Sequence, residues 1–154
     1  MQQYIGQSIE PYSPLSRSMC LLDNIEAIDG SSFCASVILN ESSSFAESTG
    51  VPGWLGIEYM AQTIAAFAGV KADAKQEPVK IGFLLGSRKY QSDISEFPFN
   101  KKIYVQVKEL MQDESGLGVF ECQISIDDEV VAQARLNVFQ PEDPVKFINE
   151  QENE

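Results

Sequence analysis

The chain has 154 residues, of which 44% are hydrophobic, and it carries a formal net charge of −12. This length and composition are typical of one globular domain with its own core. The negative charge argues against nucleic-acid binding, which depends on Lys and Arg neutralising phosphates.

Histidine is absent from the sequence. Ser-His-Asp triads, Cys-His pairs and histidine-based metal sites therefore cannot be built from this chain alone. The three cysteines, Cys20, Cys34 and Cys122, are far apart and lack zinc-binding spacing. We expect reduced thiols, no metal and no cofactor. Residues 1–13 have neither the basic start nor the apolar run of a signal peptide, so we expect a cytoplasmic protein.

The first third of the chain predicts two paired strands. Residues 19–28 have the composition of a strand, and Asp29-Gly30 is a turn signal. Residues 32–39 then alternate apolar with smaller or polar side chains, as a returning strand does. A polar loop is expected over residues 40–50.

A long helix is expected over residues 53–73. Ala, Leu, Met, Gln and Ile dominate this stretch, and Pro52 and Gly53 suit its start. The helix is apolar on nearly every face and long enough to span a bilayer. Glu58 and Gln62 would be costly in lipid, so we expect the buried centre of a domain and no membrane contact.

The rest of the chain predicts strands and a tail. Four strand-like runs follow the helix, with turn signals at 113–116 and 127–128, and such short connections predict an antiparallel meander. The tail over 141–154 is acidic and is expected to be flexible, leaving a single domain over 1–140. The strand-like runs are residues 79–92, 102–111, 117–127 and 130–139.

A long apolar helix with about six antiparallel strands has few compact arrangements. A curved antiparallel sheet wrapped around the helix would bury every face of it. The predicted fold is therefore α+β, of the hotdog type, with one central helix.

The start of this helix carries a family motif. The pattern P-G-x-x-x-x-E-x-x-x-Q, from Pro52 to Gln62, resembles the central helix of 3-hydroxyacyl-[acyl carrier protein] dehydratases of the FabA and FabZ type. The longer phrase GVPGWLGIEYMAQTIAAFAG, with IGFLLGSRKY and ARLNVFQP further on, is most similar to the ApeP-like branch of aryl polyene clusters. The similarity covers residues 11–140.

The resemblance implies roles for the residues of this motif. Glu58 matches the acid that protonates the leaving hydroxyl, and apolar surroundings would favour its protonated form. Gln62, one turn later, would hydrogen-bond to Glu58 and orient it. The Gly53 N–H matches the donor to the thioester oxygen. Pro52 and Trp54 are expected to lie beside the substrate.

The chain departs from the family at the catalytic base. The family has a histidine in a loop resembling L-P-H before M-x-L-L-D. Residues 13–23, SPLSRSMCLLD, keep this register and Pro14, but Leu15 stands at the histidine position. Leucine cannot accept a proton, so this loop is expected to be inactive.

The family places its two active sites at a dimer interface, each combining the loop of one subunit with the helix carboxylate of the other. A homodimer of this chain would lack a base in both sites. A heterodimer with a histidine-bearing homologue would have one complete site. We therefore expect a dehydratase subunit that is inactive alone and acts, with such a partner, on acyl carrier protein thioesters.

Two other functions remain open at this point. A hotdog acyl thioesterase would use Glu58 as base or nucleophile and needs no histidine. A catalytically silent subunit would bind a carrier protein or stabilise a partner. Candidate side chains for carrier docking are Arg17, Arg88, Lys89, Lys101 and Lys102, and candidates for lining an acyl tunnel are Trp54, Tyr59, Phe67 and Phe83.

Overall fold

The structure is a computed structural model that describes residues 1–15, 19–78, 82–141 and 149. The side chains of Phe83 and Arg88 are also outside the description. The expected flexible tail falls almost entirely outside these residues and stays a prediction. No helix in the described part of the chain is long and apolar enough to cross a bilayer.

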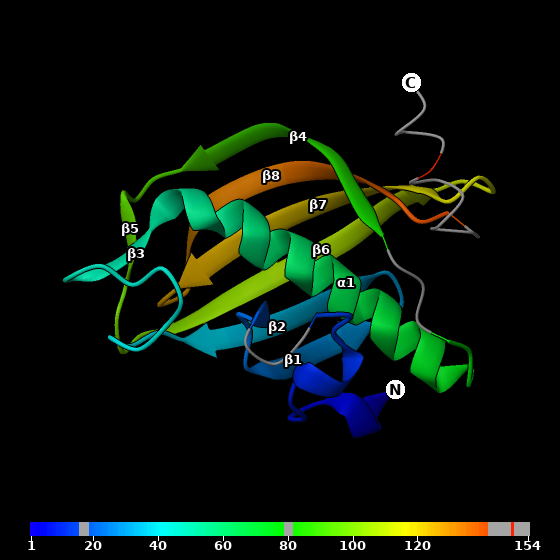
Figure 1. The fold of residues 1–154 in the computed structure, drawn as a ribbon, viewed down its shortest axis with the longest axis horizontal. Coiled ribbons are helices and arrows are strands. Elements are labelled where there is room, and N and C mark those ends of the chain that lie inside the picture. Colours follow the sequence, from blue (N-terminus) through cyan, green and yellow to red (C-terminus); the bar gives the residue numbers. More distant parts are fainter. Residues whose placement is uncertain (16–18, 79–81, 142–148, 150–154) are drawn as a thin grey trace.

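The described residues form one long helix, α1 (Gly56–Ala74), that lies across an antiparallel sheet (Figure 1). A 3-10 turn, η4 (Gly53–Leu55), leads into α1, so the helix expected over 53–73 is confirmed. Two short 3-10 turns, η1 (Gln2–Tyr4) and η2 (Glu10–Tyr12), precede the sheet. The strands are β1 (Asn24–Asp29), β2 (Ser32–Ile38), β3 (Gly50–Pro52), β4 (Phe83–Ser92), β5 (Glu96–Pro98), β6 (Lys102–Gln112), β7 (Leu117–Ile126) and β8 (Glu129–Phe139).

The large sheet has the strand order β1-β2-β6-β7-β8-β4, and all its pairs are antiparallel. The meander is confirmed for β6, β7 and β8. It is wrong for β4, which pairs with β8 at the edge of the sheet instead of with β6. The short β3–β5 pair at the start of α1 was not predicted, because three-residue strands carry no detectable alternation.

The first strand begins at Asn24, later than the expected residue 19. The residues before it bond to other parts of the chain. The Leu21 N–H donates to the Gln62 side chain, and the Asp23 N–H donates to the Ser36 carbonyl. Residues 19–23 therefore form a loop that crosses α1.

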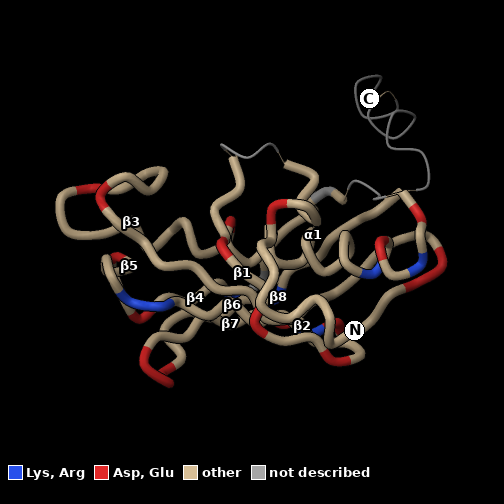
Figure 2. The backbone as a smooth tube through the Cα atoms, turned by 90° about the horizontal axis from the view of Figure 1, so that it is seen from below, with Lys and Arg blue, Asp and Glu red and all other residues tan. Residues whose placement is uncertain are grey.

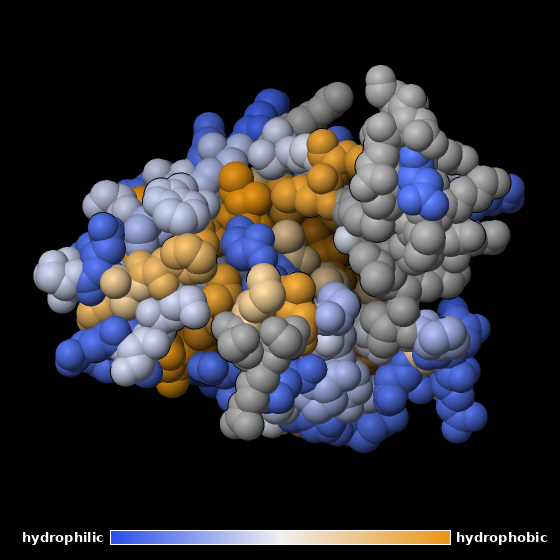
Figure 3. Space-filling model, in the orientation of Figure 1, coloured by the Kyte–Doolittle hydropathy of each residue, from blue (hydrophilic) through white to orange (hydrophobic). Residues whose placement is uncertain are grey.

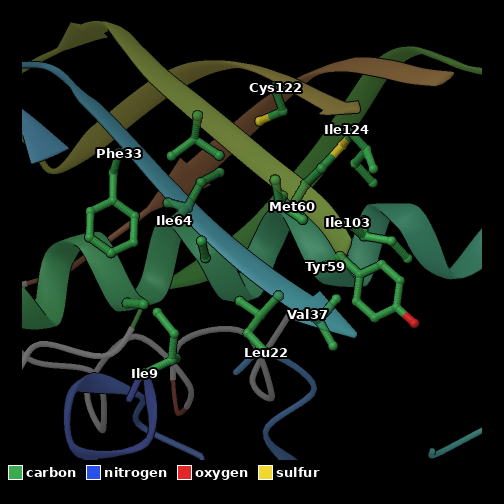
Figure 4. Close-up of a cluster of buried hydrophobic side chains, with 14 of the residues drawn as sticks. Ile9, Leu22, Phe33, Val37, Tyr59, Met60, Ile64, Ile103, Cys122 and Ile124 are labelled. Atoms are coloured by element: carbon green, nitrogen blue, oxygen red, sulfur yellow. The ribbon is translucent and has the colours of Figure 1, made fainter. Parts of the chain in front are cut away.

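The core lies between α1 and the inner face of the sheet (Figure 4). Met60 and Ile64 of α1 are buried, and Phe67 stacks on Phe33 of β2 with ring centroids 5.2 Å apart. Tyr59 is buried against Phe97. Each such side chain contributes roughly 1.5–3 kcal/mol of transfer free energy, so this layer fixes α1 on the sheet.

One face of α1 is left uncovered by the sheet. Ala61, Ala65, Ala68 and Ala72 are only half-buried, and Glu58 is exposed. Their spacing places them on one side of the helix. The hotdog fold is confirmed, but the expectation that the sheet buries every face of α1 is wrong for this chain, because the sheet packs on one side of the helix only (Figure 2).

Candidate functional site

The candidate acid, Glu58, lies in the first turns of α1. Its Oε1 accepts a hydrogen bond of 3.0 Å from Gln62 Nε2, as the spacing of four residues predicted. The carboxylate is exposed in this chain, so the apolar surroundings expected for it are not provided by the chain itself. The reason is its position on the uncovered face of α1.

Gln62 is buried, with 6% of its surface exposed, and bonds in three directions. Besides Glu58, its Nε2 donates to the Met19 carbonyl at 3.0 Å, and its Oε1 accepts from the Leu21 N–H at 2.8 Å. These bonds fix the amide group in one orientation. They also attach the loop that follows Leu15 to the helix that carries Glu58, which the motif alone did not reveal.

The loop at the lost-base position carries no proton acceptor at Leu15. Leu15 is half-buried, and its N–H donates to Ser13 Oγ at 3.1 Å. Ser16 and Arg17 lie outside the described residues. Because the whole chain lacks histidine, any imidazole base has to come from another chain.

The Gly53 N–H, the expected donor to the thioester oxygen, is bonded inside this chain. It donates to the Ser95 carbonyl at 2.9 Å. A Cβ at Gly53 would lie 2.7 Å from the Ile94 carbonyl oxygen. The close approach of residues 94 and 95 therefore explains the glycine, and no substrate is needed to account for it.

Tyr90, in edge strand β4, anchors the start of the helix. Its hydroxyl donates to the Gly53 carbonyl at 2.5 Å. A Cβ at Gly56 would overlap the same hydroxyl. Burial raises the pKa of Tyr90 above its ordinary value, so the phenol remains a donor at neutral pH. The sequence showed Tyr90 only as part of a strand pattern and gave no signal for this contact.

An exposed aromatic pair lies next to the helix start. Trp54 is 63% exposed and Phe45 is 60% exposed, and their rings meet edge to face at 5.9 Å. Pro52 is half-buried and pairs with Glu96 between β3 and β5. Phe45 was missed because it stands in a polar, serine-rich loop.

Other candidate residues have structural partners. Tyr59 and Phe67 pack in the core, and Tyr59 also lines a cavity beside Cys20 and Leu21. The Phe83 side chain lies outside the description. Lys101 pairs with Asp127 at 3.0 Å and Lys102 with Glu26 at 2.8 Å. The described Lys and Arg residues are scattered along the backbone and do not gather on one face (Figure 2).

The sequence profile of the ApeP-like family, described as ApeP dehydratase, matches residues 7–149. The chain belongs to this family. No curated protein matches the sequence. The ApeP-like assignment agrees with the resemblance carried by residues 50–70.

Solved structures agree with the fold of this ApeP-like chain. A chain of the dehydratase heterocomplex ApeI:P from Xenorhabdus doucetiae matches with a TM-score of 0.83 and 27% identity, over 93% of this chain and 96% of that chain. An uncharacterized protein from Pyrococcus horikoshii matches with a TM-score of 0.62 and 13% identity, over 90% and 98%. A hypothetical thioesterase from Streptococcus pneumoniae, solved with coenzyme A, matches with a TM-score of 0.59 and 13% identity, over 77% and 90%. At these low identities the last two likenesses show the fold alone.

The site thus brings together one exposed carboxylate and one buried amide. A carboxylate fixed by an amide can give or take one proton. The first-turn amides of a helix lack intrahelical acceptors and favour negative charge beside them. A reaction that removes one proton and donates another at the same time needs a second proton-transfer group.

Proposed function

We propose that this chain is the subunit of a dehydratase that supplies Glu58 to a site completed by a histidine from a homologous hotdog partner. The substrate is a 3-hydroxyacyl thioester of acyl carrier protein. One observation carries the proposal: Glu58 is exposed and held in place by buried Gln62, in a chain that has no histidine.

In the proposed reaction, each subunit carries out one of the two proton transfers. The partner's imidazole removes the proton from the carbon next to the thioester carbonyl. Glu58 protonates the neighbouring hydroxyl, which leaves as water. Negative charge on the thioester oxygen is favoured at the N-terminus of α1. A partner that covers the open face of α1 would also place Glu58 in the apolar surroundings that favour its protonated form.

Edge strand β4 is the proposed contact for this partner. Leu84 and Leu85 of this strand are 44% and 55% exposed, and its outer edge faces no other described strand. Unpaired strand edges with apolar side chains are suited to pairing with another chain. Tyr90, on the same strand, bonds to the start of α1, so such a partner would lie close to Glu58.

A heteromeric partner is supported by the likeness to the ApeI:P heterocomplex. We assign carrier-protein docking to the partner, since carrier proteins are acidic and this chain carries a net charge of −12. The candidate cations Lys101 and Lys102 pair with acids of this chain.

The intact mass of a carrier protein loaded with a 3-hydroxyacyl group tests the proposal. The chain alone is expected to leave the mass unchanged. Addition of a histidine-bearing hotdog homologue that co-purifies with the chain is expected to remove one water. Water loss by the chain alone would show that no partner base is needed. Loss of the acyl group would identify a thioesterase instead.

Glu58→Gln then separates catalysis from assembly. The complex is expected to form as in the wild type, while dehydration slows by about 10²–10⁴-fold because the proton donor is lost. Glu114→Gln, at an exposed turn, is the matched control and is expected to leave the rate unchanged. An unchanged rate for Glu58→Gln would favour a silent subunit.

A further inference from the structure

A cavity of about 320 Å³ lies beside the start of α1, between the loop over residues 19–23 and the loop over residues 40–44. It is separate from the hollow on the uncovered face of α1, where apolar side chains gather in the space-filling view (Figure 3), and none of the described residues lines both. Its volume is at the small end of the range for ligand sites, roughly 300–1,000 Å³. The cavity therefore suits a small molecule.

The hydroxyl of Tyr59 is a polar group on a buried side chain that lines this cavity. Tyr59 is only 1% exposed, and its hydroxyl bonds to no other group in the described part of the chain. The hydroxyl points away from the core side chains of Met60 and Ile64 (Figure 4). Burial raises the pKa of Tyr59, so the phenol keeps its proton at neutral pH. Because buried polar groups are nearly always hydrogen-bonded, this donor indicates an acceptor inside the cavity.

The other polar side chains of the cavity wall favour a positively charged group. The carboxylate of Asp23 lines the cavity, and its Oδ2 accepts from the Ile38 N–H at 2.9 Å, which leaves Oδ1 for a ligand. The serines at positions 42–44 add hydroxyl oxygens. No Lys or Arg is among the described lining residues, and the whole chain carries a net charge of −12.

Hydrogen bonds fix both loops that form the cavity. The Asn40 N–H donates to Ser43 Oγ at 2.9 Å, and the Ser42 N–H donates to Asn40 Oδ1 at 2.7 Å. On the opposite wall, the Leu21 N–H donates to the Gln62 side chain. A site whose walls are already fixed loses little conformational entropy when a ligand binds.

We propose that this cavity binds a small amino alcohol in its ammonium form. The ammonium donates to the Asp23 carboxylate. The ligand hydroxyl accepts from the Tyr59 phenol and donates to a serine hydroxyl, because a hydroxyl can do both. The methylene groups between them lie against Leu21, Val37 and Leu39, the apolar part of the wall.

Titration of the isotope-labelled full chain with ethanolamine, 3-amino-1-propanol and 5-amino-1-pentanol tests the site through amide chemical shifts. Amides of residues 20–23 and 42–44 are expected to shift with at least one of these probes, with a Kd of about 1 mM. The alkylamine and the diol of the same length are expected to bind about tenfold more weakly, because each lacks one polar contact. The readout is binding to the chain alone, so it is independent of the proposed dehydratase function.

Two variants separate the two polar contacts. Asp23→Asn keeps an acceptor for the Ile38 N–H but removes the charge, and is expected to weaken amino alcohol binding to the level of the diol. Tyr59→Phe keeps the ring against Phe97, and is expected to weaken it to the level of the alkylamine. Asp29→Asn, at the exposed end of β1, is the matched control and is expected to change no Kd. Thermal unfolding checks that each variant is folded.

Three results would overturn the proposal. The first is the absence of shifts around the cavity with every amino alcohol. The second is equal binding of the amino alcohol, the alkylamine and the diol, which would mean that the cavity recognises only the alkyl chain. The third is an unchanged amino alcohol Kd in both Asp23→Asn and Tyr59→Phe, which would place the bound probe elsewhere.

Discussion

Both halves of α1 pack in the core, but the N-terminal half also carries the hydrogen bonds around Glu58. Hydrogen bonds fix the N-terminal half: Tyr90 bonds to the Gly53 carbonyl, and Gln62 bonds to Glu58 and to the preceding loop. These bonds are directional, so they set the orientation of a carboxylate as well as its position.

Packing fixes the C-terminal half of α1. Phe67 stacks on Phe33, and Gly69 lies directly against the Tyr12 backbone. This half stabilises α1 without contacting Glu58, while the N-terminal half both packs in the core and orients Glu58. Substitutions in the two halves should therefore separate loss of stability from loss of activity.

The largest stability effect is expected from Gly69→Ala. The added Cβ would overlap the Tyr12 carbonyl oxygen, and backbone cannot move away as cheaply as a flexible side chain. Overpacking of this kind costs about 1–3 kcal/mol or more, which exceeds the gain of about 1 kcal/mol in helix propensity. Urea unfolding measures the loss, and dehydration per folded complex should stay at the wild-type level.

Gly86→Ala is the control for this substitution. Nothing lies within 4 Å of a Cβ built at Gly86. The free energy of unfolding should therefore change by no more than about 0.5 kcal/mol. If Gly69→Ala were as stable as Gly86→Ala, packing against η2 would not be what holds the C-terminal half of α1.

Gln62→Ala should affect both stability and activity. It removes the partners of the Met19 carbonyl and the Leu21 N–H, at a cost of about 1–2 kcal/mol. It also frees Glu58, so dehydration in the reconstituted complex should slow by about ten- to a hundredfold. Gln123→Ala, which removes an exposed bond to Gln106, should change neither. A normal rate for Gln62→Ala would show that Glu58 needs no orientation from the helix.

The features predicted correctly from the sequence depend on local periodicity. Alternation over 102–139 identified β6, β7 and β8, and the apolar composition of 53–73 identified α1. The place of β4 beside β8 depends on pairing between distant strands, which no local pattern records. The uncovered face of α1 was missed for the same reason, since it depends on the side of the helix on which the sheet packs.

The candidate site was predictable only where its contacts are local. The Glu58–Gln62 bond follows from a spacing of four residues on a helix. The bond from the Gly53 N–H to the Ser95 carbonyl could not be predicted, because Ser95 lies far along the chain. Tyr90 was missed because a tyrosine in a strand is ordinary, and its partner is a backbone carbonyl with no sequence signature.

The smallest effect is expected from Tyr90→Phe, which removes one hydrogen bond from the start of α1. At neutral pH the variant should lose about 1 kcal/mol of unfolding free energy, because the Gly53 carbonyl loses its donor.

The pKa of Tyr90 is raised by burial above its ordinary value of about 10. The contribution of the phenol is therefore complete below about pH 10 and is lost as pH rises through the raised pKa. Urea unfolding of both proteins from pH 7 upwards should show their difference shrinking only at alkaline pH. Other tyrosines titrate equally in both proteins and cancel in the difference. A difference that is absent at pH 7 would mean that the Gly53–Ser95 bond alone holds the start of the helix.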